Sequence, residues 1–203
     1  MLAAALLLAL AMSGGQACKY RDHNVIPDVI DNAPTKALNI SFPSGAGASY
    51  GNELTPTQVK DMPKVYTDLD DKDGYYTLAF VDPDVPSRKN PEQGQWLHWL
   101  VVNIPGSSFQ DGDVSAGHTM AEYISSAPPE GSGLHRYVFL LYKQVGPIEP
   151  KENVVTATTA RGRPKFDIRT YAREYNLGDP LSGNFYQAQY DDYVPVVHAT
   201  LKD

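Results

Sequence analysis

The fold is decided by the stretch Trp96-Leu97-His98-Trp99-Leu100-Val101-Val102-Asn103-Ile104, which the Pro105-Gly106 turn ends. The stretch is nearly continuous in apolar residues, and such a run bounded by turn residues is typical of a strand buried on both faces. Two other apolar stretches, residues 75–81 and 134–143, have the aromatic and β-branched content of strands. The sequence therefore predicts a mainly β fold built around buried strands.

Shorter elements are expected around these strands. Residues 38–42 and 185–190 are predicted to be strands, and residues 25–31 and 196–201 short helices. Residues 168–175 have an apolar stripe with helical spacing, which predicts an amphipathic helix. A helix of about two turns is also predicted after Thr55-Pro56, because proline is favoured at the first helical position.

Composition indicates one compact domain, which we expect to span residues 18–203. The chain has 203 residues, of which 42% are hydrophobic and 20% charged, so it is long enough to bury a substantial core. The formal net charge of −7 gives no broad attraction to phosphate backbones, so nucleic acid is not expected as a partner. Any phosphate must therefore be recognised by a local pocket.

The N-terminus predicts secretion. Residues 1–12 are apolar but too few to span a bilayer, and small residues follow, so residues 1–17 are predicted to be a signal peptide cleaved before Cys18. No transmembrane segment is expected. Cys18 is the only cysteine, which excludes an intrachain disulfide. The sequon Asn39-Ile40-Ser41 is a candidate glycosylation site on the same route.

Polar residues occur at the boundaries of the predicted strands. Asp82 and Asp84 follow the strand at residues 75–81, in a loop that prolines stiffen. His98 lies in the second strand, and His135 and Tyr137 in the third. We expect these groups to converge at one sheet edge, where the carboxylates would raise the pKa of both imidazoles. Such a set could hold a phosphate and an ammonium group of one ligand.

Strand alternation assigns these side chains to faces. His98 is predicted to share a face with Trp96 and Leu100, and His135 a face with Tyr137. Arg136 falls on the opposite face and is predicted to form a structural ion pair.

Each of these residues could also serve a purely structural purpose or a different chemistry. Alone, the aspartates could cap turns and His98 could be a hydrogen-bonded core histidine. Two histidines and two aspartates could also bind a metal ion, although no metal or other cofactor is expected. Neither a Gly-x-Ser-x-Gly elbow nor a His-Glu-x-x-His helix is present, so enzyme activity is not expected. The joint spacing favours a ligand pocket.

Four motifs resemble the phosphatidylethanolamine-binding protein family, which includes the Raf kinase inhibitor proteins. They are Asp82-Pro83-Asp84-Val85-Pro86-Ser87-Arg88, residues 96–106, residues 128–137 and Tyr190-Asp191-Asp192-Tyr193-Val194-Pro195. The resemblance implies a large central antiparallel sheet, a smaller sheet packed on it and a few helices. It also implies an anion pocket lined by Asp82, Asp84, Trp96, His98, Pro128, Pro129, His135 and Tyr137.

Two residues depart from the family pattern. Ala127 stands where most relatives have glycine before the proline pair, and its Cβ could narrow the pocket mouth. His198 aligns where many animal relatives place a tyrosine over the pocket. Because histidine can become charged, we expect His198 to join the ligand site and to strengthen phosphate binding at mildly acid pH.

The expected function follows from the pocket and the predicted route. The sequence predicts a secreted, non-enzymatic carrier or sensor whose small anion pocket takes a phosphorylated or zwitterionic head group, such as that of a phosphatidylethanolamine-type lipid. The alternative is an extracellular inhibitor of serine proteases or carboxypeptidases, as some family members are, with a protease as partner and surface contacts as the means.

Overall fold

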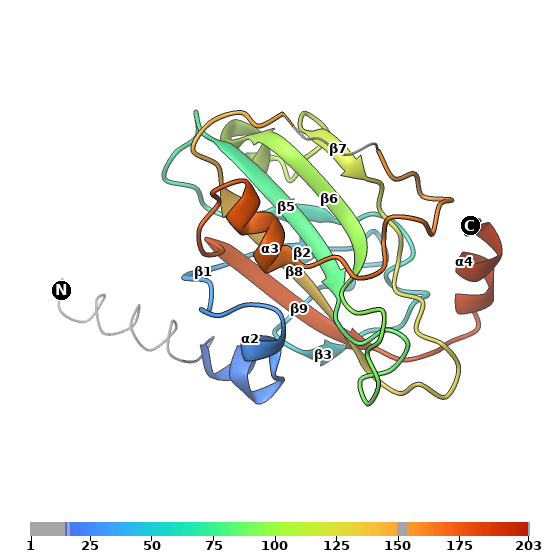
Figure 1. The fold of residues 1–203 in the computed structure, drawn as a ribbon. Helices are drawn as coiled ribbons and strands as arrows, with labels where there is room; N and C mark the ends of the chain where they lie inside the picture. Colours follow the sequence, from blue (N-terminus) through green and yellow to red (C-terminus); the bar gives the residue numbers. More distant parts are fainter. Residues whose placement is uncertain (1–14, 16, 150–153, 203) are drawn as a thin grey trace.

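The computed structural model describes residues 15, 17–149 and 154–202 (Figure 1). Within this part of the chain, a seven-stranded sheet has the order β1-β9-β8-β5-β6-β7, and β3 also pairs with β9. The small second sheet pairs β2 with β4. The large sheet consists of β1 (Lys36–Ala37), β3 (Asn52–Glu53), β5 (Tyr75–Asp82), β6 (Trp96–Pro105), β7 (His118–Ala121), β8 (His135–Lys143) and β9 (Ser182–Ala188).

The large sheet is mixed, not wholly antiparallel as the family resemblance implied. Pairing is antiparallel from β9 through β8, β5 and β6 to β7. The two short strands β1 and β3 both run parallel to β9. The early chain reaches the free edge of β9 from far away in sequence, so no hairpin fixes the direction in which it pairs.

The core consists of two layers, one on each face of the large sheet. One layer lies between this sheet and the sheet of β2 (Asn39–Ser41) and β4 (Lys64–Tyr66), and contains Trp99, Tyr137 and Phe139. The other contains Leu100 and Val138 and is covered by the N-terminal helical residues and α3 (Ile168–Glu174), which lies in front of the sheet in Figure 1. Strands buried on both faces explain the continuous apolar runs.

Several local predictions agree with the structure. The helix expected at residues 168–175 is α3, where the Asp167 side chain accepts hydrogen bonds from the backbone N–H groups of Arg169 and Thr170. The other two expected helices are α2 (Val25–Asp28), which is shorter, and α4 (Val194–Thr200), which begins earlier. The strand expected at residues 185–190 is β9, shifted towards the N-terminus, and the one at residues 38–42 is β2.

The helix predicted after Thr55-Pro56 is wrong. Thr55 and Gln58 do cap each other, with Gln58 N–H donating to the Thr55 hydroxyl at 3.2 Å and Thr55 N–H to the Gln58 side chain at 2.9 Å. Residues 56–59 nevertheless form only a turn. Pro63 and the following β4 leave too little chain for a second helical turn.

The predicted signal peptide lies almost wholly outside the described residues. In the described part of the chain, no helix is long and apolar enough to cross a membrane. Cys18 is exposed, and Asn39 of the sequon lies on an exposed position of β2.

Candidate ligand-binding pocket

A small cavity lies where β5 ends and β6 and β8 begin. Its volume is about 150 Å³. Because β5 is antiparallel to both neighbours, the end of β5 and the starts of β6 and β8 meet at one edge of the sheet. The C-terminal helix α4 covers the cavity. The cavity is lined by Asp82, Val85, Trp96, His98, Ile124, Ala127, Pro129, His135, Tyr137, Val197, His198 and Leu201.

A buried ion pair lies in this pocket. The Nδ1 atom of His135 lies 2.8 Å from a carboxylate oxygen of Asp82, and both residues are almost fully buried. Burial lowers the pKa of His135, but the hydrogen bond and negative charge of Asp82 outweigh burial, so the pKa is raised overall. The expected increase is therefore confirmed for His135.

Ser132 contacts the second ring nitrogen of the His135 imidazole. The Nε2 atom of His135 lies 3.0 Å from the Ser132 hydroxyl, which itself donates to the Pro129 carbonyl at 2.7 Å. Since the serine hydrogen is used on the carbonyl, the serine oxygen accepts from Nε2–H. Both ring nitrogens then donate, which is the pattern of a protonated imidazole. The line Ser132–His135–Asp82 has the spacing of a catalytic triad, but a protonated histidine cannot accept the serine proton.

The pKa of His98 is shifted in the opposite direction to that of His135. The Nδ1 atom of His98 lies 2.9 Å from the Ile124 carbonyl oxygen, which can only accept, so Nδ1–H donates. Burial lowers the pKa of His98 to about 4, despite the opposing charge of Asp82. The expected increase is wrong for this residue because no carboxylate contacts it closely enough to offset desolvation. At neutral pH His98 is an uncharged wall of the pocket.

The face predicted for His98 is correct in part. The β5–β6 register shifts between Phe80 and Val81, which pair with Trp99 and Leu97, so His98 is the extra residue of a bulge. Its ring packs against Phe80 at 5.1 Å and Tyr137 at 5.3 Å between ring centroids. Trp96 lines the pocket with it, but Leu100 packs in the opposite core layer. A bulge reverses the alternation beyond it.

Tyr137 contributes a buried hydroxyl. The side chain is fully buried and its ring stacks on Tyr186 at 5.2 Å between centroids. Within the described residues, no partner meets hydrogen-bond geometry for this hydroxyl, although burial and the nearby charge of Asp82 raise its pKa. A buried hydroxyl in a pocket wall costs free energy unless a ligand or water satisfies it.

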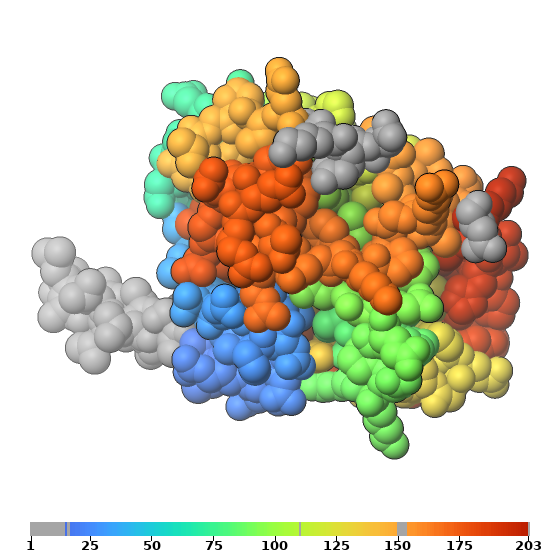
Figure 2. Space-filling model, viewed as in Figure 1, coloured from blue at the N-terminus to red at the C-terminus, as the bar shows by residue number. Residues whose placement is uncertain are grey.

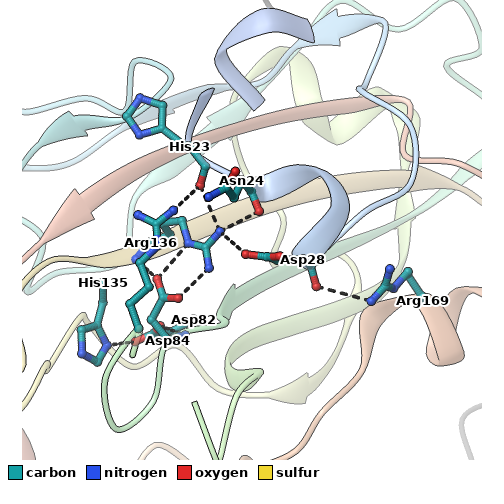
Figure 3. A network of polar contacts seen from close by, with 9 residues as sticks. His23, Asn24, Asp28, Asp82, Asp84, His135, Arg136 and Arg169 are labelled. Carbon is teal, nitrogen blue, oxygen red and sulfur yellow. Dashed lines mark hydrogen bonds and ion pairs between the residues drawn. The ribbon is translucent and has the colours of Figure 1, made fainter. Parts of the chain in front are cut away.

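Asp84 lies outside the pocket, on the other face of the sheet (Figure 3). Its carboxylate accepts from Arg136 at 2.6 Å and 2.9 Å, and from the Arg136 backbone N–H at 2.8 Å. Arg136 also pairs with Asp28 at 2.8 Å, so the predicted structural role of Arg136 is confirmed. His135 and Arg136 are neighbours in β8 and point to opposite sides, so His135 contacts Asp82 in the pocket while Arg136 contacts Asp84 away from it (Figure 3). Asp84 lies beyond the end of β5, where strand alternation no longer applies.

The two neighbouring prolines also differ in their position relative to the pocket. Pro129 lines the pocket, whereas Pro128 is buried beside it and does not. The two residues that depart from the family pattern meet at the mouth, where Nε2 of His198 lies 3.0 Å from the Ala127 carbonyl oxygen. His198 is exposed on α4, so one hydrogen bond links the C-terminal helix to the loop before the prolines.

Sequence reasoning missed the apolar part of the pocket and its support. Val197 and Leu201 come from the C-terminus, and Ile124 from a loop. Arg163 is fully buried and donates to the backbone carbonyls of Thr159, Leu97, His98, Glu122 and Thr156 at 2.9 to 3.3 Å. It therefore fastens the strand next to the pocket to two loops. A single arginine in a Gly- and Pro-containing loop carries no pattern that would have revealed this role.

The pocket suits a small ligand with polar and charged groups. The carboxylate of Asp82 can accept from an ammonium group, while the Tyr137 hydroxyl can donate to a phosphate or another acceptor. Both ring nitrogens of His135 already contact protein groups, so its contribution to anion binding would be electrostatic. Across residues 17–149 and 154–202, no three His, Cys, Asp or Glu side chains are placed to hold one metal ion. The metal alternative would have needed Asp84, which faces away.

The structure combines a two-sheet β scaffold with a small cavity that contains a buried charge pair and a buried tyrosine hydroxyl. The chain belongs to the phosphatidylethanolamine-binding protein family, whose model matches residues 35–187. The predicted family is thus confirmed.

Three known proteins are similar to the chain over most of its length. “Putative odorant-binding protein A5” of Drosophila melanogaster is 34% identical over 181 residues, which are 89% of this chain and 83% of that protein. “26 kDa secreted antigen” of Toxocara canis is 38% identical over 174 residues, 85% of this chain but only 63% of the antigen. The solved structure described as “CG7054 solution structure” is 44% identical, with a TM-score of 0.73, covering 89% of this chain and 99% of its own.

Proposed function

We propose that the protein is a secreted, non-enzymatic binding protein whose pocket takes a small phosphorylated or zwitterionic head group, such as phosphoethanolamine. The buried Asp82–His135 ion pair beside the Tyr137 hydroxyl carries the proposal. It offers an acceptor for an ammonium group and a hydroxyl donor for a phosphate within one cavity. At about 150 Å³ the cavity takes a head group and leaves acyl chains outside.

The non-enzymatic role rests on the hydrogen-bond pattern of His135. A general base must be unprotonated to activate a hydroxyl, but Asp82 raises the pKa of His135 and Ser132 spends its hydrogen on Pro129. The relative named as a secreted antigen and the relative named as odorant-binding support secretion and ligand carriage.

The first experiment titrates the protein with soluble phosphoethanolamine and follows backbone amide chemical shifts. We expect saturable shifts at Asp82, His98 and His135. Asp82→Asn keeps the size of the side chain but removes the charge, so it should weaken binding at least tenfold, because a charge-assisted hydrogen bond contributes about 1.5–3 kcal/mol. The matched control is Asp192→Asn, at an exposed position outside the pocket.

Absence of shifts would remove the head-group proposal. Inhibition of a serine protease or carboxypeptidase through surface contacts would then become the leading function. That alternative predicts that an Asp82→Ala/His135→Ala double variant, if folded, inhibits as well as the unaltered protein, whereas a carrier would lose its ligand.

A further inference from the structure

A second cavity lies on the opposite face of the large sheet from the pocket. Its volume is about 520 Å³, and we call it the α3 groove. It opens between the orange-red helix α3 and the orange segment that follows residue 153, on the side of the molecule seen in Figure 2. The groove is lined by Leu97, Leu100, Met120, Val154, Val155, Thr159, Arg161, Gly162, Phe166 and Tyr171.

The floor of the α3 groove is apolar and rigidly supported. Leu97, Leu100 and Met120 come from β6 and β7 and belong to the core layer beneath α3. On one wall, the Val155 N–H donates to the Met120 carbonyl at 2.8 Å, and the Val155 carbonyl accepts from the Glu122 N–H at 2.9 Å. The wall therefore extends the edge of β7 and stays in place without a ligand.

The rim combines an exposed apolar residue with a positive charge. Val154 has 48% of its surface exposed, and Arg161, later in the same segment, is also exposed. Among the described residues that line the groove, Arg161 is the only charged one. The chain carries a net charge of −7, so a groove whose only charge is positive stands out from the surface around it.

Two polar hollows, of about 510 and 660 Å³, differ from the groove. One places Asp31 and Asp179 beside Arg169 and Arg173, and the other surrounds the Arg136–Asp84 pair, so both carry charges of both signs. Only the α3 groove among these three joins an apolar floor to an uncompensated charge of one sign. That combination matches a molecule with an apolar tail and an anionic head.

Gly162 lies close to Val155 in the groove, next to Arg161 in the sequence. Its φ of +87° lies in the left-handed region, and an added Cβ would approach Cγ2 of Val155 to 3.2 Å. Any larger residue at position 162 would strain the backbone and press on the side chain of Val155.

We propose that the α3 groove binds a long-chain fatty acid, with the tail over Leu97, Leu100 and Met120 and the carboxylate at Arg161. The volume lies in the range of ligand sites that bury most of a molecule of this size. The site is separate from the head-group pocket, because Leu97 and His98 are consecutive strand residues and point to opposite faces of the sheet. The proposal therefore stands whether or not the pocket binds phosphoethanolamine.

The test titrates the protein with octanoate, decanoate and dodecanoate below their micelle concentrations, and follows amide shifts. Saturable one-to-one shifts are expected at Leu97, Leu100 and Met120 and not at His135. Each added methylene should tighten binding about fourfold until the groove is filled.

Substitutions at two exposed residues distinguish binding of the apolar tail from binding of the carboxylate. Val154→Glu places a negative charge in the apolar wall and should weaken dodecanoate and neutral 1-dodecanol alike by at least tenfold. Arg161→Gln should weaken dodecanoate up to about fivefold, as expected for an exposed ion pair, and leave 1-dodecanol unchanged. The matched controls are Val145→Glu, at a valine with 91% of its surface exposed, and Arg21→Gln.

Three results would overturn the proposal. They are the absence of saturable dodecanoate binding, shifts confined to His135 and Tyr137, and equal weakening by Val154→Glu and Val145→Glu. Equal loss of dodecanoate and 1-dodecanol in Arg161→Gln would refute the role of Arg161 in holding the head. Loss of phosphoethanolamine binding in Asp82→Asn is measured separately, so the two proposals can fail independently.

Discussion

At the residue scale, the pKa values of two histidines in one pocket are shifted in opposite directions. His135 contacts Asp82 directly and its pKa is raised, whereas His98 contacts only a carbonyl and its pKa falls to about 4. Distance to the carboxylate decides between them, because an ion pair at 2.8 Å offsets desolvation and a more distant charge does not. The two imidazoles of one pocket therefore change charge in different pH ranges.

The neutral histidine predicts a loss of stability in acid. Because the pKa of His98 is near 4 when folded and about 6.5 when unfolded, its contribution to stability is complete above pH 6.5 and is lost as pH falls towards 4. The loss is at most about 3 kcal/mol. The raised pKa of His135 acts in the opposite sense, since its contribution is complete below pH 6.5 and is lost at higher pH.

Urea unfolding of His98→Gln between pH 7 and pH 4.5 checks this expectation. The variant should be less stable than the unaltered protein at pH 7, by about 1–2 kcal/mol for the lost packing, but its stability should fall less on acidification. His118→Gln, at an exposed histidine, should keep the original pH dependence. Parallel curves for His98→Gln and the unaltered protein would contradict the assignment of a neutral, buried His98.

At the scale of elements, the pocket is closed by α4, which is far in sequence from the strands that hold its charged residues. Val197, His198 and Leu201 form the cover, and the His198–Ala127 hydrogen bond attaches it to the loop before the prolines. In this chain the cover presents an imidazole to a pocket that already contains Asp82, His98 and His135.

The imidazole on α4 predicts stronger phosphoethanolamine binding in mild acid. A histidine side chain can carry a positive charge, and such a charge over the pocket attracts the phosphate. The affinity at pH 5.5 should exceed that at pH 7.5 by about threefold, as expected for a partly exposed charge pair. In His198→Tyr the ratio should be closer to one, because the hydroxyl does not titrate in this range. Equal ratios in the two proteins would exclude this role.

At the scale of the whole molecule, the proposed secretion predicts the mature chain. The N-terminal segment before Cys18 should be removed and Asn39 should carry a glycan, because the sequon occupies an exposed position of β2. Mass spectrometry of protein secreted from eukaryotic cells should give Cys18 as the first residue. Asn39→Gln and Ser41→Ala should both remove the glycan, the second with the asparagine intact. An unprocessed N-terminus on intracellular protein would contradict the proposed route.

The sequence by itself determined the elements whose signal is local. The three buried strands and α3 follow from continuous apolar runs and from one apolar stripe, and both patterns extend over seven residues or more. The strands β1, β3 and β7 have only two to four residues and show no period, so their existence was not predicted. The equally short β2 was predicted because the turn residues after Phe42 mark its end. The spacing of Asp82, His98, His135 and Tyr137 likewise sufficed to indicate one pocket at one sheet edge.

Only the tertiary structure decided which of these residues line the pocket and which form structural contacts elsewhere. The bulge at His98, the pairing of Asp84 with Arg136 on the far face and the carbonyl cage around Arg163 depend on contacts between residues that are distant in the sequence. So does the α3 groove, whose floor and walls come from strands, a helix and a loop. Desolvation and pairing are set by neighbours in space, and for that physical reason charge state and ligand geometry could not be inferred along the chain.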